Sequence, residues 1–385
     1  MQGFFEYNEE PDFMRYSMLK EQITLPEGFT IRDSFGDRYV IEGLLGKGRV
    51  GAVYLVRDWR VKQRLFALKE VINPNKQDRE RFIFEAEILK RLDHRALPRV
   101  HRIFEHGKLK RVYMLMDYIK GKNLETLRKE QPEQRFSLSL VLALMAPIVD
   151  ALIYLHHQEP PIVHRDIKPE NIIVPIGADE AVLVDFGSAK EYVAERGTTF
   201  IQHSSPGYAA PEQYGSGTSH RTDIYGLGAT VYTLLTGTIP PDSITRVTRS
   251  RGKGSNDPLR PANLLAPLVP AAVTEALQRA MTLSSADRFE TVEEFWKLLN
   301  AHAPEQQVQL PRVTSVDAPQ PLPDRDIEGT IFTRKHWILL LIFLALLVTV
   351  AFGTGLLSLV WGLSVLLLLC LGALFLVFLP LIDQQ

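Results

Sequence analysis

The chain has 385 residues, and its 44 lysines and arginines nearly balance its 45 aspartates and glutamates, which leaves a formal net charge of −1. This length is sufficient for a two-lobed catalytic domain with additional segments, and the near-neutral charge provides no field that would favour nucleic acid. The one cysteine, Cys370, excludes a disulfide framework within the chain, and the acidic N-terminus excludes a signal peptide.

The first predicted elements are three strands, which follow a segment without a clear period. Residues 1–37 mix aromatic and acidic side chains, so they are interpreted either as a poorly ordered lead-in or as a segment packed on a small lobe. Apolar runs then predict strands at Tyr39–Leu45, Ala52–Arg57 and Leu65–Val71.

A glycine-rich turn separates the first two of these strands. Gly46–Val53 has the pattern G-x-G-x-x-G-x-V, and its glycines allow the backbone to approach phosphate groups closely. Dinucleotide-binding folds use a similar string between a strand and a helix, whereas this string lies between two strands. The context therefore favours a nucleotide-phosphate loop of another fold.

Helical periodicity dominates the chain after the third strand. Gln77–Leu92 predicts a helix, Val112–Asp117 a further strand and Leu138–His157 a long apolar helix. Charged and histidine residues interrupt the long helix, which argues against a membrane span at this position. The pattern is again helical from Asp223 to Leu299.

Two short motifs carry the side chains that phosphoryl transfer requires. The first is His164–Asn171, which reads HRDIKPEN, and the second is Asp185-Phe186-Gly187. Such transfer needs an acceptor hydroxyl held in line and neutralisation of the charge on the moving phosphoryl group. Asp166 can accept the hydroxyl proton, and Lys168 can lie against the transferring phosphate. Asn171 and Asp185 supply the hard oxygens that Mg²⁺ prefers.

Together these motifs resemble those of the eukaryotic-type (Hanks-type) Ser/Thr protein kinases, and the resemblance extends over roughly Arg38–Ala301. It implies an α+β fold of two lobes, a small β-rich N-lobe and a larger α-helical C-lobe, which we assign to residues 38–301. The phrase Ala-Pro-Glu-Gln-Tyr at 210–214 and the compact layout are typical of bacterial, membrane-anchored members.

The resemblance also assigns residues to ATP. Lys69, in Ala67-Leu68-Lys69, would hold the α- and β-phosphates and pair with Glu85, because Glu87 lies about 200° away around the helix. Val53 and Ala67 would line the adenine pocket. The implied ATP-binding residues are Gly46, Lys47, Gly48, Gly51, Val53, Ala67, Lys69, the gatekeeper Met116 and, through their backbone, Asp117 and Ile119. The implied catalytic residues are Lys69, Glu85, Asp166 and Lys168, with Asn171 and Asp185 as ligands of Mg²⁺, for which Mn²⁺ is a substitute.

The stretch from Asp185 to Glu212 has the length of an activation segment, which implies a protein acceptor. Lys168 and Ser205 resemble the arrangement of Ser/Thr-selective members, in which a hydroxyl bonds both the catalytic aspartate and the lysine. Glu212 would form a buried structural ion pair with Arg288.

Phosphorylation of this segment is a further implication of the resemblance. Arg165, before the catalytic base, is typical of members that are switched on when a phosphothreonine pairs with this arginine. Thr198 and Thr199 are the candidate sites, with Ser204 as a third. The alternative is that they are ordinary loop hydroxyls. Asp223 would be the scaffold aspartate beneath the catalytic loop.

The C-terminal part of the chain has a different composition. Residues 302–335 are rich in Pro and Gln and are interpreted as a linker, whereas 336–382 contain no Lys, Arg, Asp or Glu. One helix across this apolar run would be roughly 68 Å long. Because a bilayer core is about 30 Å thick, two transmembrane helices in a hairpin fit better. Arg334 and Lys335 favour a cytoplasmic kinase domain.

The sequence therefore predicts a membrane-anchored Ser/Thr protein kinase that uses ATP and Mg²⁺ and acts on protein substrates. The expected partners are these substrates, the lipid bilayer and a second copy for trans-phosphorylation, with no nucleic acid. The rival prediction is a pseudokinase, an ATP-binding scaffold at the membrane. Loss of Lys69, Asp166 or Asp185 would favour that rival, and all three are present.

Overall fold

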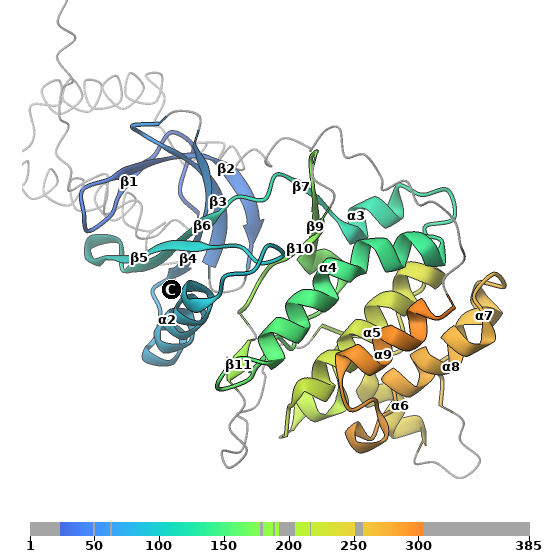
Figure 1. Ribbon diagram of the computed structural model, residues 1–385. Coiled ribbons are helices and arrows are strands. Elements are labelled where there is room, and N and C mark those ends of the chain that lie inside the picture. Colours follow the sequence, from blue (N-terminus) through green and yellow to red (C-terminus); the bar gives the residue numbers. More distant parts are fainter. Residues whose placement is uncertain are drawn as a thin grey trace, which may run out of the picture. The chain divides into compact units, whose positions relative to one another are not determined.

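The computed structural model describes residues 24–48, 51–61, 64–177, 180–187, 189–191, 205–215, 217–250 and 257–302. These residues form a small lobe built on a β-sheet and a larger helical lobe (Figure 1). The predicted α+β fold of two lobes is confirmed. The predicted linker and membrane hairpin, together with Thr198 and Thr199, lie outside the described residues.

The small lobe consists of one six-stranded sheet and one helix. In chain order the strands are β1 Thr30–Arg32, β2 Arg38–Lys47, β3 Gly51–Asp58, β4 Leu65–Ile72, β5 Val100–His106 and β6 Arg111–Asp117. Their order in the sheet is β1-β2-β3-β4-β6-β5, and all neighbours are antiparallel. Helix α2, Lys76–Arg91, begins at the N-cap Asn75, whose side chain accepts from the Asp78 N–H at 2.8 Å.

Successive residues of a strand face opposite sides of the sheet, and this divides the small-lobe core in two. Tyr54, Leu68 and Tyr113 belong to an apolar cluster on one face. On the other face Val71 and Met114 pack with the apolar side of α2 and extend into the core of the helical lobe. The second face is the one that meets the larger lobe.

Residues 24–37, which precede the predicted start of the kinase domain at residue 38, pack on the small lobe. Leu25, Phe29 and Ile31 are buried in the first apolar cluster, and β1 pairs with β2. The Leu25 N–H also donates to the Tyr54 hydroxyl at 2.9 Å. Sequence analysis did not predict this strand because only three residues form it, and they alternate around a single buried side chain.

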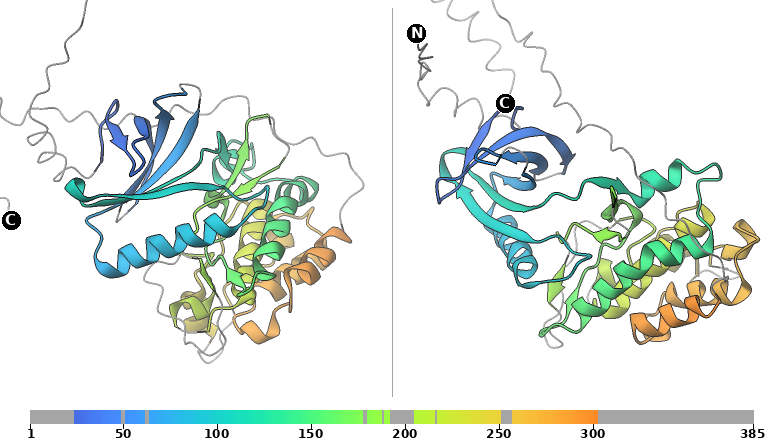
Figure 2. Two further views of the ribbon diagram at one scale, coloured as in Figure 1. Left: turned by 60° about the vertical axis from the view of Figure 1, so that its left-hand side comes forward. Right: turned by 45° about the horizontal axis from the view of Figure 1, so that its top comes forward.

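The larger lobe consists mainly of helices packed side by side (Figure 2). Its helices are α3 Leu124–Lys129, α4 Leu138–His156, α5 His220–Thr236, α6 Ser243–Ser250, α7 Ala262–Leu265, α8 Ala271–Ala280 and α9 Val292–Asn300. Helix α4 packs against α5 and α9, and α5 packs against α8. Among the described residues α4 alone has the length and apolar composition of a membrane span, and most of it is buried inside this lobe.

Two short sheets flank the two motifs. One contains β7 Gly121–Asn123, β9 Ile172–Pro175 and β10 Val182–Leu183, and the other pairs β8 Ile162–Val163 with β11 Lys190–Glu191. The motif residues from His164 to Asn171 lie between β8 and β9, and Asp185 follows β10. These sheets therefore hold both motifs at the junction of the lobes.

Candidate active site

A cavity of about 610 Å³ lies between the small lobe and residues of β7, of β9 and the turn before it, and of the segment that follows β10. Strand register places Val53 opposite Lys69 and Ala67 opposite Met116, so these four side chains share the face of the sheet that closes the cavity. The wall also contains predicted residues from the glycine-rich turn and from the stretch after β6: Gly46, Lys47, Gly48, Gly51, Asp117 and Ile119.

The glycines at positions 46 and 51 differ in what surrounds them. A Cβ on Gly51 would lie 1.8 Å from the Glu70 carbonyl oxygen, so the close approach of β3 to β4 requires glycine at this position. A Cβ on Gly46 would meet no atom within 4 Å, so its backbone borders open space. At Gly46 the backbone is therefore open to the approach of a phosphate group.

Lys69 links the small lobe to the second motif. Its Nζ donates to Glu85 Oε1 at 2.7 Å and to Asp185 Oδ1 at 3.0 Å. Burial alone would lower the pKa of Lys69, but the charges of Asp185 and Glu85 outweigh burial and raise the pKa above its ordinary value. Lys69 is therefore a cation at neutral pH. Glu87, two residues after Glu85, is exposed and makes no such contact.

Asp185 adopts a left-handed backbone conformation with φ 65°, which turns its carboxylate toward Lys69. The Lys69 ammonium holds the pKa of Asp185 well below its usual range, so this carboxyl remains ionised. The next residue, Phe186, is fully buried, and its ring meets the His164 ring edge-on with centroids 4.7 Å apart. This packing fixes the second motif beneath the first.

Four polar side chains converge at the catalytic loop. Lys168 Nζ donates to Asp166 Oδ2 at 2.8 Å and to Ser205 Oγ at 2.7 Å. The Ser205 hydroxyl donates to Asp166 Oδ1 at 2.7 Å. Asn171 Nδ2 donates to Asp166 Oδ2 at 2.9 Å. The Asp166 carboxylate is thus held by three donors and already accepts a hydroxyl.

Asp223, at the start of α5, supports this loop from below. Its carboxylate accepts the N–H groups of His164 at 2.9 Å and Arg165 at 2.7 Å, and it also contacts His156 Nε2 at 2.9 Å. The Arg165 backbone has φ 66°, a conformation that L-residues rarely adopt and that these bonds stabilise. Sequence analysis did not assign His156 a role, because its partner lies on another helix.

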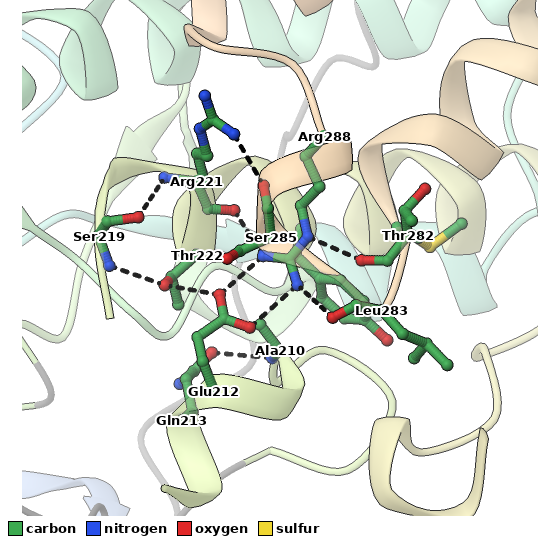
Figure 3. Close-up of polar contacts among 12 residues, drawn as sticks. Ala210, Glu212, Gln213, Ser219, Arg221, Thr222, Thr282, Leu283, Ser285 and Arg288 are labelled. Atoms are coloured by element: carbon green, nitrogen blue, oxygen red, sulfur yellow. Dashed lines mark hydrogen bonds and ion pairs between the residues drawn. The ribbon is translucent and has the colours of Figure 1, made fainter. Parts of the chain in front are cut away.

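The end of the activation segment is anchored by the predicted ion pair (Figure 3). Arg288 donates to both carboxylate oxygens of Glu212, at 2.7 and 2.9 Å, and its side chain is fully buried. The same guanidinium donates to the carbonyls of Thr282 and Arg221, and Thr222 Oγ1 donates to Glu212 at 2.9 Å. The anchor therefore joins the stretch after Ser205 to the core of the helical lobe.

The donor set in the cavity fits a divalent cation and a nucleotide. Asp185 is ionised, and Asn171, which donates through Nδ2, presents its amide oxygen as a further ligand. Lys69 supplies a positive charge beside them. Residues such as Leu44, Ile173 and Val184 add apolar walls that suit a flat aromatic base. Sequence analysis did not find these three, because their proximity arises only from tertiary packing.

Comparison with known proteins agrees with this geometry. Residues 39–257 match the protein kinase domain family. The serine/threonine-protein kinase PknD of Chlamydia trachomatis is 29% identical over 302 residues, which cover 69% of this chain and 31% of that relative. Serine/threonine-protein kinase B of Synechocystis is 31% identical over 223 residues, covering 53% of this chain and 38% of that protein. The chain thus spans only about a third of the length of these relatives.

The fold is also similar to solved structures. The crystal structure of the Mycobacterium tuberculosis PknI kinase domain superposes with a TM-score of 0.55 at 27% sequence identity. The superposition covers 73% of this chain and 100% of that domain, which agrees with the extent of the two lobes described above.

Proposed function

Because this chain belongs to the protein kinase family, we propose that it is a serine/threonine protein kinase that transfers the γ-phosphoryl group of ATP to seryl and threonyl hydroxyls of proteins. The names of the relatives support the choice of Ser/Thr over other acceptors. ATP is the phosphoryl donor in this proposal, and Mg²⁺, with Mn²⁺ as a substitute, is the metal.

The observation that carries the proposal is the contact of a hydroxyl with the base. Ser205 Oγ–H donates to Asp166 at 2.7 Å and accepts from Lys168 at 2.7 Å. An acceptor hydroxyl requires the same surroundings: a carboxylate that takes its proton and a cation beside the forming oxygen–phosphorus bond. As that bond forms, the bond from the γ-phosphorus to the bridging oxygen breaks, the proton passes to Asp166 and ADP leaves.

Residues of the cavity would orient ATP for this step. Lys69, held by Glu85, would contact the α- and β-phosphates, and the glycine-rich turn would cover them. Asp185 and Asn171 would hold Mg²⁺, which when bound neutralises charge on the phosphates. Met116, Asp117 and Ile119 border the same cavity, where the base would lie.

We also propose that phosphorylation of the activation segment regulates the enzyme. Burial lowers the pKa of Arg165 to about 10; the charge of Asp223 opposes this shift, and repulsion by the charge of Arg81 adds to it. A phosphate on Thr198 or Thr199 would relieve this repulsion by pairing with Arg165. A Thr198→Ala/Thr199→Ala variant that keeps full activity would contradict this part of the proposal.

A membrane location is proposed from the sequence of residues 336–382 alone. Their length without charged residues suits a hairpin of two transmembrane helices, with the kinase domain on the cytoplasmic side. Confinement to a membrane raises local concentration, which would favour trans-phosphorylation between copies. Extraction of the full-length protein by alkaline carbonate would contradict the anchor.

The test is phosphate transfer from Mg-ATP by the full-length protein in lipid, beside an Asp166→Asn variant, with sites mapped by mass spectrometry. We expect label on Ser and Thr with the natural chain and a loss of at least about 100-fold with the variant. Binding of ATP without transfer by the natural chain would overturn the kinase proposal and favour the pseudokinase alternative.

A further inference from the structure

The backbone of Arg165 is held on both sides, through its N–H and its carbonyl, and one of the partners has no assigned role. The Arg165 N–H donates to Asp223, as described above, while the Arg165 carbonyl accepts from Gln213 Nε2 at 2.8 Å. The N–H on the far side of this peptide, that of Asp166, has only a long contact of 3.4 Å to His164 Nδ1. Of the two hydrogen bonds to the peptide between Arg165 and Asp166, the one from Gln213 is therefore the shorter.

Gln213 is itself fixed at both ends of its side-chain amide. It lies in the short 3₁₀ helix Pro211–Tyr214 and is 3% exposed. Its Oε1 accepts from the Ala210 N–H at 3.0 Å, while its Nε2 reaches the catalytic loop. Its neighbour Glu212 is bound to Arg288 (Figure 3), so the amide extends from an anchored backbone.

From this geometry we infer that Gln213 is a positioning residue for the base Asp166, and that it couples the anchored end of the activation segment to the base. The inference rests on the proposed function, because Asp166 is a base only in a kinase. Ser205 and Gln213 then hold the same residue in two ways: Ser205 contacts the Asp166 carboxylate, and Gln213 fixes the preceding peptide.

The physical reason is the strain at Arg165. A residue with φ 66° lies in a sparsely populated region and keeps that conformation only when its surroundings determine it. Without the donor from Gln213, the Arg165 carbonyl loses this bond, which lowers the barrier to a rotation of the backbone toward a more favourable φ. That rotation would turn the Cα–Cβ bond of Asp166 away from the acceptor hydroxyl.

Only a neutral amide, or a neutral carboxylic acid, satisfies both contacts of Gln213. Its side chain must accept from Ala210 and donate to Arg165 at the same time. An ionised glutamate can accept but cannot donate, and methionine has a similar length but can do neither well. A protonated glutamate can again do both.

These differences define the test, made with full-length protein in lipid. Gln213→Met and Gln213→Glu are compared with the natural chain, and Thr222→Val is the matched control, because it removes a bond to Glu212 within the same anchor but none to the catalytic loop. Steady-state transfer from Mg-ATP gives kcat and KM, and hydrogen exchange read by mass spectrometry reports on peptides around Arg165.

We expect Gln213→Met to lower kcat about tenfold, with the KM for ATP within about twofold and faster exchange around Arg165. Gln213→Glu should match that loss at pH 8 and recover towards pH 6, because burial raises the pKa of the new carboxyl and favours its protonated, donating form. The ratio of the kcat of Gln213→Met to the kcat of the natural chain should not change between pH 6 and pH 8. Thr222→Val should lower thermal stability but leave kcat and the exchange of the loop unchanged.

A loss of kcat in Thr222→Val equal to that in Gln213→Met would overturn the inference, since both would then report only a weakened anchor. Unchanged exchange around Arg165 in Gln213→Met would overturn it as well. The exchange measurement does not depend on activity. A natural chain that transfers no phosphate therefore refutes the proposed function, while the exchange still decides whether Gln213 holds the loop.

Discussion

At the scale of single residues, Ser205 has contacts that set it apart from an ordinary loop hydroxyl. Its one hydroxyl group donates to Asp166 and accepts from Lys168, so it fixes both side chains with respect to each other. Charge-assisted hydrogen bonds of this kind are stronger than neutral ones. The rate of transfer should therefore depend on this hydroxyl even though no step requires it to react.

We predict that Ser205→Ala lowers kcat about tenfold, which corresponds to the loss of one such bond, whereas Ser205→Thr retains most of the activity. The measurement is initial-rate phosphate transfer to a protein acceptor at saturating ATP. Ser137→Ala is the control, because Ser137 caps α4 through the Leu140 N–H and its loss affects stability alone. A Ser205→Ala variant with the natural kcat would contradict the prediction.

Sequence analysis identified the residues of the site that belong to compact motifs. Asp166, Lys168 and Asn171 are close in the chain, so the sequence alone predicts that their side chains act together. Gln213 and His156 were not identified, because their partners at Arg165 and Asp223 are remote in sequence and a lone Gln or His is usually a surface residue. Only the tertiary packing shows what they contact.

At the scale of elements, the Glu212–Arg288 pair joins the short helix Pro211–Tyr214 to the loop before α9. The Arg288 side chain is 0% exposed, and that of Glu212 is 12% exposed. Removal of one partner leaves a buried charge without compensation, which costs more than the pair itself contributes.

We predict that Arg288→Met lowers the free energy of unfolding by about 3 kcal/mol and that the double variant Glu212→Gln/Arg288→Met recovers part of this loss. Urea unfolding monitored by circular dichroism measures both. The control is Lys76→Met, which breaks an exposed pair with Glu80 and should change the value by less than about 0.5 kcal/mol. Equal effects of Lys76→Met and Arg288→Met would refute the argument from burial.

The predicted elements agree with the structure where the hydrophobic pattern is strong. Helix α2 begins one residue before the predicted Gln77, and β4 begins at the predicted Leu65. Strand β5 was not predicted, because Phe104 is its one buried side chain and four of its seven residues are polar or charged. An edge strand of this kind is defined by pairing with β6 rather than by its own composition.

At the scale of the whole molecule, the segment before β1 closes the core of the small lobe. Leu25 is fully buried, and its N–H begins a chain of bonds through the Tyr54 hydroxyl to the Glu70 carboxylate, which also binds Arg111. Glu70 directly follows Lys69 in β4, so the N-terminal segment is connected to the strand that carries the lysine proposed to bind ATP.

We predict that Leu25→Ala destabilises the protein by about 3 kcal/mol, because it removes a buried side chain from a closed core. Thermal or urea unfolding measures this change, and Glu27→Ala, at an exposed neighbour, should lie within about 0.5 kcal/mol of the natural chain. A Leu25→Ala variant as stable as Glu27→Ala would show that residues 24–37 are dispensable to the small lobe.

Helix α4 imposes an order of events on the synthesis of the chain. It is apolar enough for a bilayer, yet its covering partners include α5 and α9, which follow it in the chain. Because the ribosome adds about 5–20 residues per second, the synthesis of α9 is completed on the order of ten seconds after that of α4. During that interval the ribosome carries an apolar helix that lacks at least one of its covering partners, α9. Folding of the helical lobe therefore competes with binding of α4 by chaperones or by the membrane-insertion machinery.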